Sequence, residues 1–150
     1  MWRVLLALTI LAAGAPAFGQ VQDLRDVPDE KLRHWLKPGD PISVPSDGAR
    51  YSLVDFTPTT GAQVVVTTKR VGRSGTSFAR RLIDCRAQTF AYIGEGDTLA
   101  ELDENIKKRQ KNPDPLTAYV DQSISWYIAR ASCMELSVVL EERRRHSTSR

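Results

Sequence analysis

Two cysteines, Cys85 and Cys133, constrain this sequence more than any other feature. They are the only cysteines in 150 residues, so just one intramolecular disulfide is possible. They lie 48 positions apart, and closing a loop of that size is worth roughly 4 kcal/mol of stability. Because small domains have only about 5 to 15 kcal/mol of stability, such a bond would fix much of the fold. The alternatives are two free buried thiols, or a dimer cross-linked through one cysteine.

The start of the chain indicates export to a compartment in which disulfides form. One positive charge, Arg3, is followed by an apolar run over residues 4–13 and then by small residues up to Gly19. These are the parts of a secretory signal peptide, so we expect residues 1–19 to be removed by cleavage after Gly19 or, as second choice, after Ala17. The run is shorter than the roughly 20 residues that span a bilayer, which makes a membrane anchor the less favoured alternative. We expect a mature chain without a transmembrane segment, in the periplasm, at the cell surface or secreted.

Residues 20–50 are predicted to form a short helix followed by an extended linker. Pro28 near the start and Pro38-Gly39 after the end bracket the helix, whose apolar residues include Trp35 and Leu36. So short a helix must dock on another part of the chain. Residues 39–48 contain two further prolines and no hydrophobic periodicity, and this pattern is typical of a linker.

The next part of the chain predicts an α+β domain over residues 51–145 that begins with an antiparallel meander. Valine- and threonine-rich or alternating segments separated by short turns predict strands at residues 51–57, 62–71, 77–85 and 89–93, with a short fifth strand at 98–102. Short connections between consecutive strands make them antiparallel neighbours. The highly charged residues 103–112 are interpreted as an exposed loop.

A long helix is predicted from Asp114 to Arg145, because an acidic N-cap followed by Pro115 is a typical helix start. Residues 146–150 are expected to be a disordered tail. On a helical wheel the apolar residues form two stripes. One stripe contains Leu116, Val120, Ile124, Tyr127, Ala131, Met134 and Val138, and the other contains Tyr119, Trp126, Ala129, Cys133, Leu136 and Leu140. We expect the cysteine stripe to face the sheet and the first stripe to be covered by Trp35 and Leu36 or by a partner chain.

The motifs that would indicate catalysis do not occur in the sequence. The two histidines, His34 and His146, do not form a zinc site of familiar spacing with the two cysteines. Gly94 and Gly96 follow a strand as in a dinucleotide-binding fingerprint, but the third glycine of that motif is missing. We therefore expect no enzyme, metal or cofactor; an enzyme whose site is assembled from distant residues is the least favoured alternative.

Charged residues gather in two places. The candidate anion-binding residues are Lys69, Arg70, Arg73, Arg80, Arg81 and Arg86, which occupy two adjacent strands and their turns. Such a basic hairpin would attract polyanions, although a solvated, edge-protecting set of charges is the alternative. No aromatic residues interleave with it, so we expect no specific nucleic-acid binding. The acidic residues Glu95, Asp97, Glu101, Asp103 and Glu104 are interpreted as a solvated edge, with a calcium site as the alternative.

Three segments resemble the surface-adhesin E proteins of Gram-negative bacteria. These segments are Leu82-Ile83-Asp84-Cys85, the partner strand at 89–93, and Ala129-Arg130-Ala131-Ser132-Cys133. The resemblance covers about residues 51–134. It implies an antiparallel sheet on which the C-terminal helix packs through the cysteine pair and, for some members, binding of host extracellular-matrix proteins.

These observations lead to two hypotheses about function. The first is an exported, non-enzymatic binding or adhesin-like domain that recognises a polyanion or an extracellular-matrix ligand through the basic hairpin. The second is an accessory subunit of a periplasmic or envelope complex that docks a partner, or a second copy of itself, through the long helix. The candidate docking residues are Val120, Ile124, Tyr127, Met134 and Val138.

Overall fold

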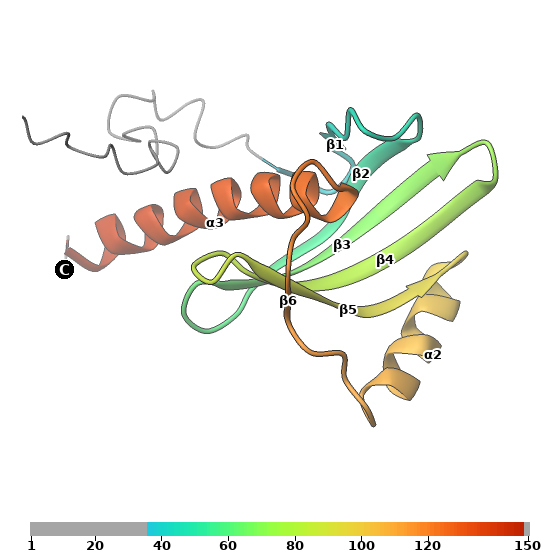
Figure 1. Cartoon of the computed structure of the whole chain (residues 1–150). Coiled ribbons are helices and arrows are strands. Elements are labelled where there is room, and N and C mark those ends of the chain that lie inside the picture. The colour runs from blue at the N-terminus through green and yellow to red at the C-terminus, as the bar shows by residue number, and fades with distance from the viewer. Residues whose placement is uncertain (1–35, 149–150) are drawn as a thin grey trace, which may run out of the picture.

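The computed structural model describes residues 36–148, which form an antiparallel sheet with a helix against each face (Figure 1). The elements are β1 (Pro41–Ile42), β2 (Arg50–Pro58), β3 (Gln63–Gly72), β4 (Gly75–Asp84), β5 (Thr89–Gly96), α2 (Leu99–Arg109), β6 (Thr117–Ala118) and α3 (Ile124–Thr148). Strand order in the sheet follows chain order from β1 to β6, and every neighbouring pair is antiparallel. The predicted α+β fold, a meander with a long C-terminal helix, is therefore confirmed.

Alternation along the strands places most of the core on one face of the sheet. Val64, Val66 and Ile83 are fully buried on this face, where they meet Ile128 and Ala129 of α3. We call it the α3 face. The four long strands lie within a few residues of the predicted ones, because each combines β-branched residues with turn residues at its ends.

The predicted fifth strand and exposed loop are wrong, because residues 98–109 form the start and body of helix α2. Thr98 caps this helix by accepting a hydrogen bond from the Glu101 amide at 3.1 Å. Leu102 and Ile106 are buried, four positions apart, against β5 on the face opposite α3. The many charged residues of this segment lie on the solvent side of an amphipathic helix. Because its apolar stripe has just two buried residues, the charges dominate the sequence pattern.

The predicted start of the long helix is also wrong, since α3 begins ten residues later, at Ile124. Asp114 forms an ion pair with Arg109 at 3.2 Å, and Thr117–Ala118 pair with the edge of β5 as strand β6. The residue that caps α3 is Ser123, whose Oγ accepts a hydrogen bond from the Trp126 amide at 3.2 Å. An acidic residue followed by proline marks a helix start only where the next residues are free to form a helix. Here two of the next residues, Thr117–Ala118, pair with β5 instead.

The buried face of α3 lies between the two stripes of the helical wheel. Its centre is formed by Ser125, Ile128 and Ser132, which are all buried. Ala129 and Leu136 of the cysteine stripe are buried on one side of this centre, while Ile124 and Tyr127 of the other stripe pack against the core on the other side. Both stripes thus border one broad contact with the sheet, and the small serines at its centre let the helix approach closely. Ser132 Oγ donates a hydrogen bond to the Ile128 carbonyl at 2.7 Å, which satisfies the hydroxyl in this buried position.

The segment predicted as a linker packs as part of the domain. Ile42 and Val44 belong to the core, and β1 pairs with the start of β2. At the other end, α3 continues to Thr148, three residues into the expected tail. The predicted signal peptide and most of the predicted N-terminal helix lie outside the described residues. Between residues 36 and 148, neither helix combines the length and the hydrophobicity that crossing a membrane requires.

Candidate functional site

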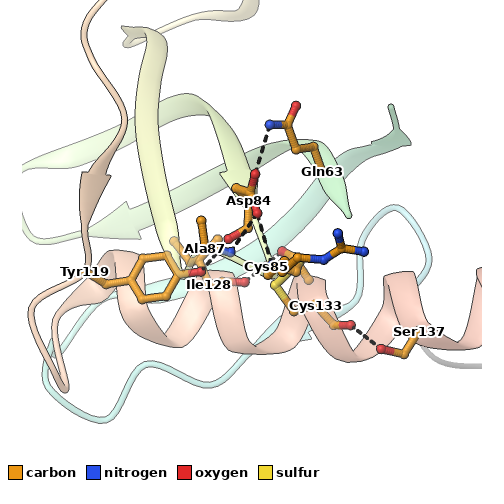
Figure 2. The surroundings of a disulfide bond; sticks show 10 residues. Gln63, Asp84, Cys85, Ala87, Tyr119, Ile128, Cys133 and Ser137 are labelled. Carbon is orange, nitrogen blue, oxygen red and sulfur yellow. Dashed lines mark hydrogen bonds between the residues drawn. A yellow bond between two sulfur atoms is a disulfide. The ribbon is translucent and has the colours of Figure 1, made fainter. Parts of the chain in front are cut away.

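A disulfide between Cys85 and Cys133 joins the end of β4 to the middle of α3 (Figure 2). The two Cα atoms are 5.5 Å apart, so the pairing predicted from the sequence is confirmed. Asp84, next to the bond, accepts hydrogen bonds from the Ala87 amide and from the Gln63 side chain, and these bonds lower the pKa of its carboxyl group. Tyr119 donates a hydrogen bond to the Asp84 carbonyl at 3.3 Å. The bond and its surroundings make this end of the sheet rigid, and a disulfide is compatible with an exported protein.

The opposite end of the sheet is not covered by α3. In Figure 1 the β3–β4 hairpin projects beyond the start of that helix. An open groove of about 420 Å³ lies there, and its lining includes Ile124, the first residue of α3. We call this feature the open-end groove. Its volume is within the usual range for sites that bind small molecules.

Arg81 lines the open-end groove and is the least expected of its residues. Its side chain is on the α3 face, and the residue is only 4% exposed. Nη1 donates a hydrogen bond to Thr68 Oγ1 at 2.9 Å and Nη2 donates one to the Tyr92 hydroxyl at 3.2 Å. The guanidinium also lies 4.6 Å from the centre of the Tyr92 ring, and the Tyr92 hydroxyl is 3.3 Å from Ser125 Oγ.

The charge of Arg81 has no counter-charge within residues 36–148. Its Nε atom is buried without a hydrogen-bond partner, and no carboxylate there forms an ion pair with the guanidinium. Among the described residues, its partners are two neutral hydroxyls and an aromatic ring. Buried cations in proteins are normally paired with an anion, because desolvating an isolated charge costs several kcal/mol. The groove therefore contains a buried cation whose charge is not paired with a carboxylate of residues 36–148.

A second cation, Arg70, borders the groove near the hairpin tip. Arg70 Nε donates to Asp47 Oδ2 at 3.1 Å and to the Tyr51 hydroxyl at 3.2 Å, while that hydroxyl donates to Asp47 at 2.6 Å. The bonds from Tyr51 and Arg70 lower the pKa of Asp47 to about 2. Burial, together with the bond to Asp47, raises the pKa of Tyr51 to about 12. The cluster holds Arg70 in place at the β3 side of the groove.

The other side of the groove is acidic. Glu95 of β5, with Asp97 and Glu101 after it, borders the groove opposite Arg70. Glu101 Oε2 accepts a hydrogen bond from the Asp97 amide at 2.9 Å, which fixes the start of α2. Asn105 of α2 donates to the Glu95 carbonyl at 2.8 Å and steadies this edge. In the described part of the chain, no group of three or more histidine, cysteine or acidic side chains is placed to hold a metal ion.

The structure does not bring the six candidate anion-binding residues together. Arg70 and Arg81 border the open-end groove on the α3 face, whereas Arg80 faces α2, where it donates to Thr67 at 2.8 Å and lies 3.7 Å from Asp103. Lys69 is half-buried on the same side as Arg80, and Arg73 is exposed in the hairpin turn. Arg86 is exposed at the far end of β4, beyond the disulfide.

The five candidate docking residues are also divided. Val120 and Met134 are 75% and 46% exposed. Ile124 and Tyr127 pack against the core, and Val138 is buried at 3% exposure. They do not form one exposed stripe.

The groove includes residues that were not predicted as functional. Tyr92 of β5 and Asp47 and Tyr51 near the start of β2 fall in this group, whereas Glu95 belongs to the predicted acidic edge. One signal in the sequence could have located the groove: Arg81 shares its strand face with Ile83 and Ala79, so alternation alone places this arginine on the core side. The partners on other strands depend on register, which the sequence does not give.

Comparisons with known proteins gave no match. No protein-family model fits the chain, and neither the search of curated proteins nor the search of solved structures found a similar one. The resemblance to the surface-adhesin E proteins therefore rests on the quoted sequence segments and stays an expectation.

Proposed function

We propose that this protein is an exported binding domain, not an enzyme, and that the open-end groove holds an anionic group of its ligand. The observation that carries the proposal is the buried guanidinium of Arg81, which lacks a carboxylate partner within residues 36–148. An anion that entered the groove would pair with this charge and with the donor hydrogens that Thr68 and Tyr92 leave free.

Two neighbouring features support an anion at this position. Arg70 borders the same groove, and although its charge is paired with Asp47, its guanidinium has further N–H donors that an anion could use. The start of α3 also lies at the groove, since Ile124 is one of its lining residues. The partial positive charge at a helix N-terminus favours negative groups nearby.

The proposed location is the periplasm, the cell surface or the medium, in line with the signal peptide expected at residues 1–19. A carboxylate on an extracellular-matrix protein would fit the anion site, which is how the adhesin-like role implied by the resemblance would operate. The side chains that border the groove are suited to binding and orienting charge.

The test is a titration of the isotope-labelled protein with acetate and with inorganic phosphate, followed by NMR of backbone amides and arginine Nε–H groups. We expect the Arg81 Nε–H signal and amides around the groove to shift, and Arg81→Gln to weaken binding by about tenfold or more. The matched control is Arg86→Gln, which removes the same charge at the far end of β4. Equal binding by the two variants, or no shift with either anion, would contradict the proposal.

A second variant separates binding from folding. Ala79 lies on the floor of the groove, between Thr68 on β3 and Glu95 on β5, so Ala79→Leu fills the space without changing any charge. We expect it to abolish the anion-induced shifts while thermal unfolding stays cooperative. Unchanged anion binding in this variant would place the site elsewhere.

Recognition of a polyanion by the outer hairpin is a distinct outcome of the same experiments. Lys69 and Arg73 lie near the hairpin tip outside the groove. Heparin retention that survives Ala79→Leu but is lost in Lys69→Gln/Arg73→Gln would assign the ligand to this outer surface and would count against the groove.

Docking of a partner chain is the second candidate function, and the exposure of Val120 and Met134 favours it. It would make the protein an accessory subunit of an envelope complex or a dimer. Light scattering that shows a dimer, lost on Val120→Asp/Met134→Asp, would support this role. A monomer whose mass does not change in the variant would argue against self-association.

A further inference from the structure

We infer that the ligand of the open-end groove is a small zwitterion, such as an amino acid or a short peptide. Its anionic end would meet Arg81, and its cationic end would meet Glu95. This inference rests on the proposed function, because it requires the anion site at Arg81.

The floor of the groove is formed by small side chains. Ser77 and Ala79 of β4 lie on the α3 face, where Ser77 pairs with Arg70 and Ala79 pairs with Thr68 of β3. On its other side Ala79 pairs with Glu95 of β5. A serine and an alanine in the middle of this row leave space that larger side chains would fill.

Opposite charges border this space on its two sides. Arg70 of β3 pairs with Ser77 and Glu95 of β5 pairs with Ala79, so the two residues are two strand spacings apart across the sheet, or about 10 Å, and are offset by two residues along it. They do not neutralise each other, since Arg70 is paired with Asp47. The Glu95 carboxylate is exposed and forms no side-chain hydrogen bond or ion pair within residues 36–148, where only its backbone carbonyl accepts a bond.

This distribution of charge discriminates between ligand classes. A simple anion can pair with Arg81, but Glu95 and Asp97 weaken its binding, and a simple cation near Glu95 is repelled by the unpaired charge of Arg81. A molecule with both charges can satisfy Arg81, which is buried and unpaired, and at the same time Glu95. A polyanion would be the poorest match, because it places negative charge along the whole groove.

The size of the groove limits the length of the zwitterion. A volume of about 420 Å³ accommodates a ligand in the range from an amino acid to a short peptide. Because Arg81 of β4 and Glu95 of β5 come from neighbouring strands and lie diagonally opposite each other, the charges of the ligand need be separated by only a few ångström.

The experiment compares three probes that differ only at their ends: triglycine, N-acetyl-triglycine and triglycine amide. Affinities are measured by NMR titration of the full mature chain. We expect triglycine to bind about tenfold more tightly than either blocked form, because each block removes one charge contact. Triglycine amide that binds as well as triglycine would overturn the inference, because it lacks the carboxylate.

Two variants test whether Glu95 contacts the cationic end of the ligand. Glu95→Gln should lower the affinity for triglycine to that for N-acetyl-triglycine and leave the affinity for N-acetyl-triglycine unchanged or higher. The matched control, Glu104→Gln, removes an exposed acid of α2 and should change neither affinity. Equal effects of the two variants would show that Glu95 makes no specific contact, and would overturn the inference.

The outcomes also distinguish this inference from the proposed function. If N-acetyl-triglycine binds as tightly as triglycine, and Arg81→Gln abolishes binding of both, the anion site is supported and the inference of a zwitterionic ligand is wrong. If acetate, phosphate and all three peptides leave the spectrum unchanged, the proposed function fails and this inference fails with it.

Discussion

The fold shifts the pKa values of two carboxylates, Asp47 and Glu135, in opposite directions. Asp47 is surrounded by donors, and its pKa falls to about 2. Glu135 of α3 accepts one hydrogen bond, from the Leu36 amide at 3.2 Å, but burial and the nearby charges of Glu142 and Asp40 raise its pKa to about 7. The single donor does not offset the desolvation and repulsion of a partly buried charge.

Glu135→Gln is expected to stabilise the protein at neutral and alkaline pH. The unfolded chain releases this proton near pH 4.5, whereas the folded protein keeps it up to about pH 7, so ionisation reduces stability as pH rises between these values. Glutamine stays neutral and can still accept the Leu36 amide. Because the group is partly exposed, we expect a gain of roughly 1 kcal/mol at pH 8.

The measurement for Glu135 is urea denaturation of both proteins at pH 5 and pH 8. The gain should be smaller at pH 5, where most of the folded protein already has Glu135 protonated. Glu142→Gln removes one of the repelling charges and should give a weaker effect of the same sign. A glutamine variant that is less stable at pH 8 would contradict this account.

Asp47→Asn is expected to destabilise the protein at neutral pH. The folded pKa of about 2 lies below the ordinary 3.8, so the ionised carboxylate contributes stability above about pH 4 that is lost as pH falls toward 2. The difference in unfolding midpoint between wild type and variant should therefore shrink over that interval. Asp121→Asn, an exposed change outside the cluster, serves as control. A constant difference from pH 7 to pH 2 would show that the ionisation of Asp47 is not its cause.

Single residues were also the hardest features to predict from the sequence. Arg80 and Arg81 belong to one predicted basic hairpin, although adjacent residues in a strand point to opposite faces. Its burial depends on Thr68 and Tyr92 from the two neighbouring strands. Such cross-strand partners are fixed by register, and a bulge between Arg80 and Arg81 sets the register here.

Among the elements, α2 depends on two glycines in β5. A Cβ atom at Gly94 would lie 2.5 Å from Ile106 Cγ1, and one at Gly96 would lie 2.6 Å from the Leu102 amide nitrogen. The helix can therefore approach the strand only because both positions lack a side chain. The Gly94-x-Gly96 pattern, which resembles the start of a nucleotide fingerprint, marks close packing between a helix and a strand.

Gly96→Ala is expected to destabilise the protein by about 1 to 3 kcal/mol, because the methyl group meets backbone rather than a flexible side chain. The matched control is Gly48→Ala. No heavy atom lies within 4 Å of a Cβ there, and φ is outside the left-handed region, so this change should be neutral or slightly stabilising. Equal stability of the two variants in urea denaturation would contradict close packing of α2.

Strands and helices were predicted with different success for a physical reason. The four long strands carry their signal locally, in β-branched residues and in turns such as that around Gly61. Helix α2 has just two buried residues, and the start of α3 is displaced because Thr117–Ala118 find a strand partner in β5. Pairing with a distant segment overrides a local capping signal, and no window of sequence contains that information.

At the scale of the whole molecule, the two ends of the sheet have different roles. At one end the disulfide holds α3 against the sheet. At the other end, where α3 begins at Ile124, the helix does not cover the sheet and the groove is open (Figure 1). The sequence predicts the bond, because two cysteines allow one pairing, but it does not predict the groove, which requires the register of three strands and the position of Ile124. The covalent link between helix and sheet and the open groove therefore lie at opposite ends of the strands.

The double variant Cys85→Ser/Cys133→Ser tests how far this arrangement depends on the bond. Opening a loop of 48 residues should lower the free energy of unfolding by roughly 4 kcal/mol, mainly because the unfolded chain gains freedom. Urea denaturation of oxidised wild type and of the variant measures the loss. A loss below about 1 kcal/mol would mean that the unfolded chain stays compact without the bond.

The same variant shows whether the groove depends on the disulfide. Ile128 and Ala129 are buried against the sheet between the bond and the start of α3, so we expect the first turns of the helix to remain docked in the folded variant. Hydrogen exchange should then accelerate mainly in the turns around Cys133 and beyond, and the anion-induced shifts at Arg81 should persist. Loss of those shifts in a variant that is still folded would show instead that the distant bond holds Ile124 and Ser125 at the edge of the groove.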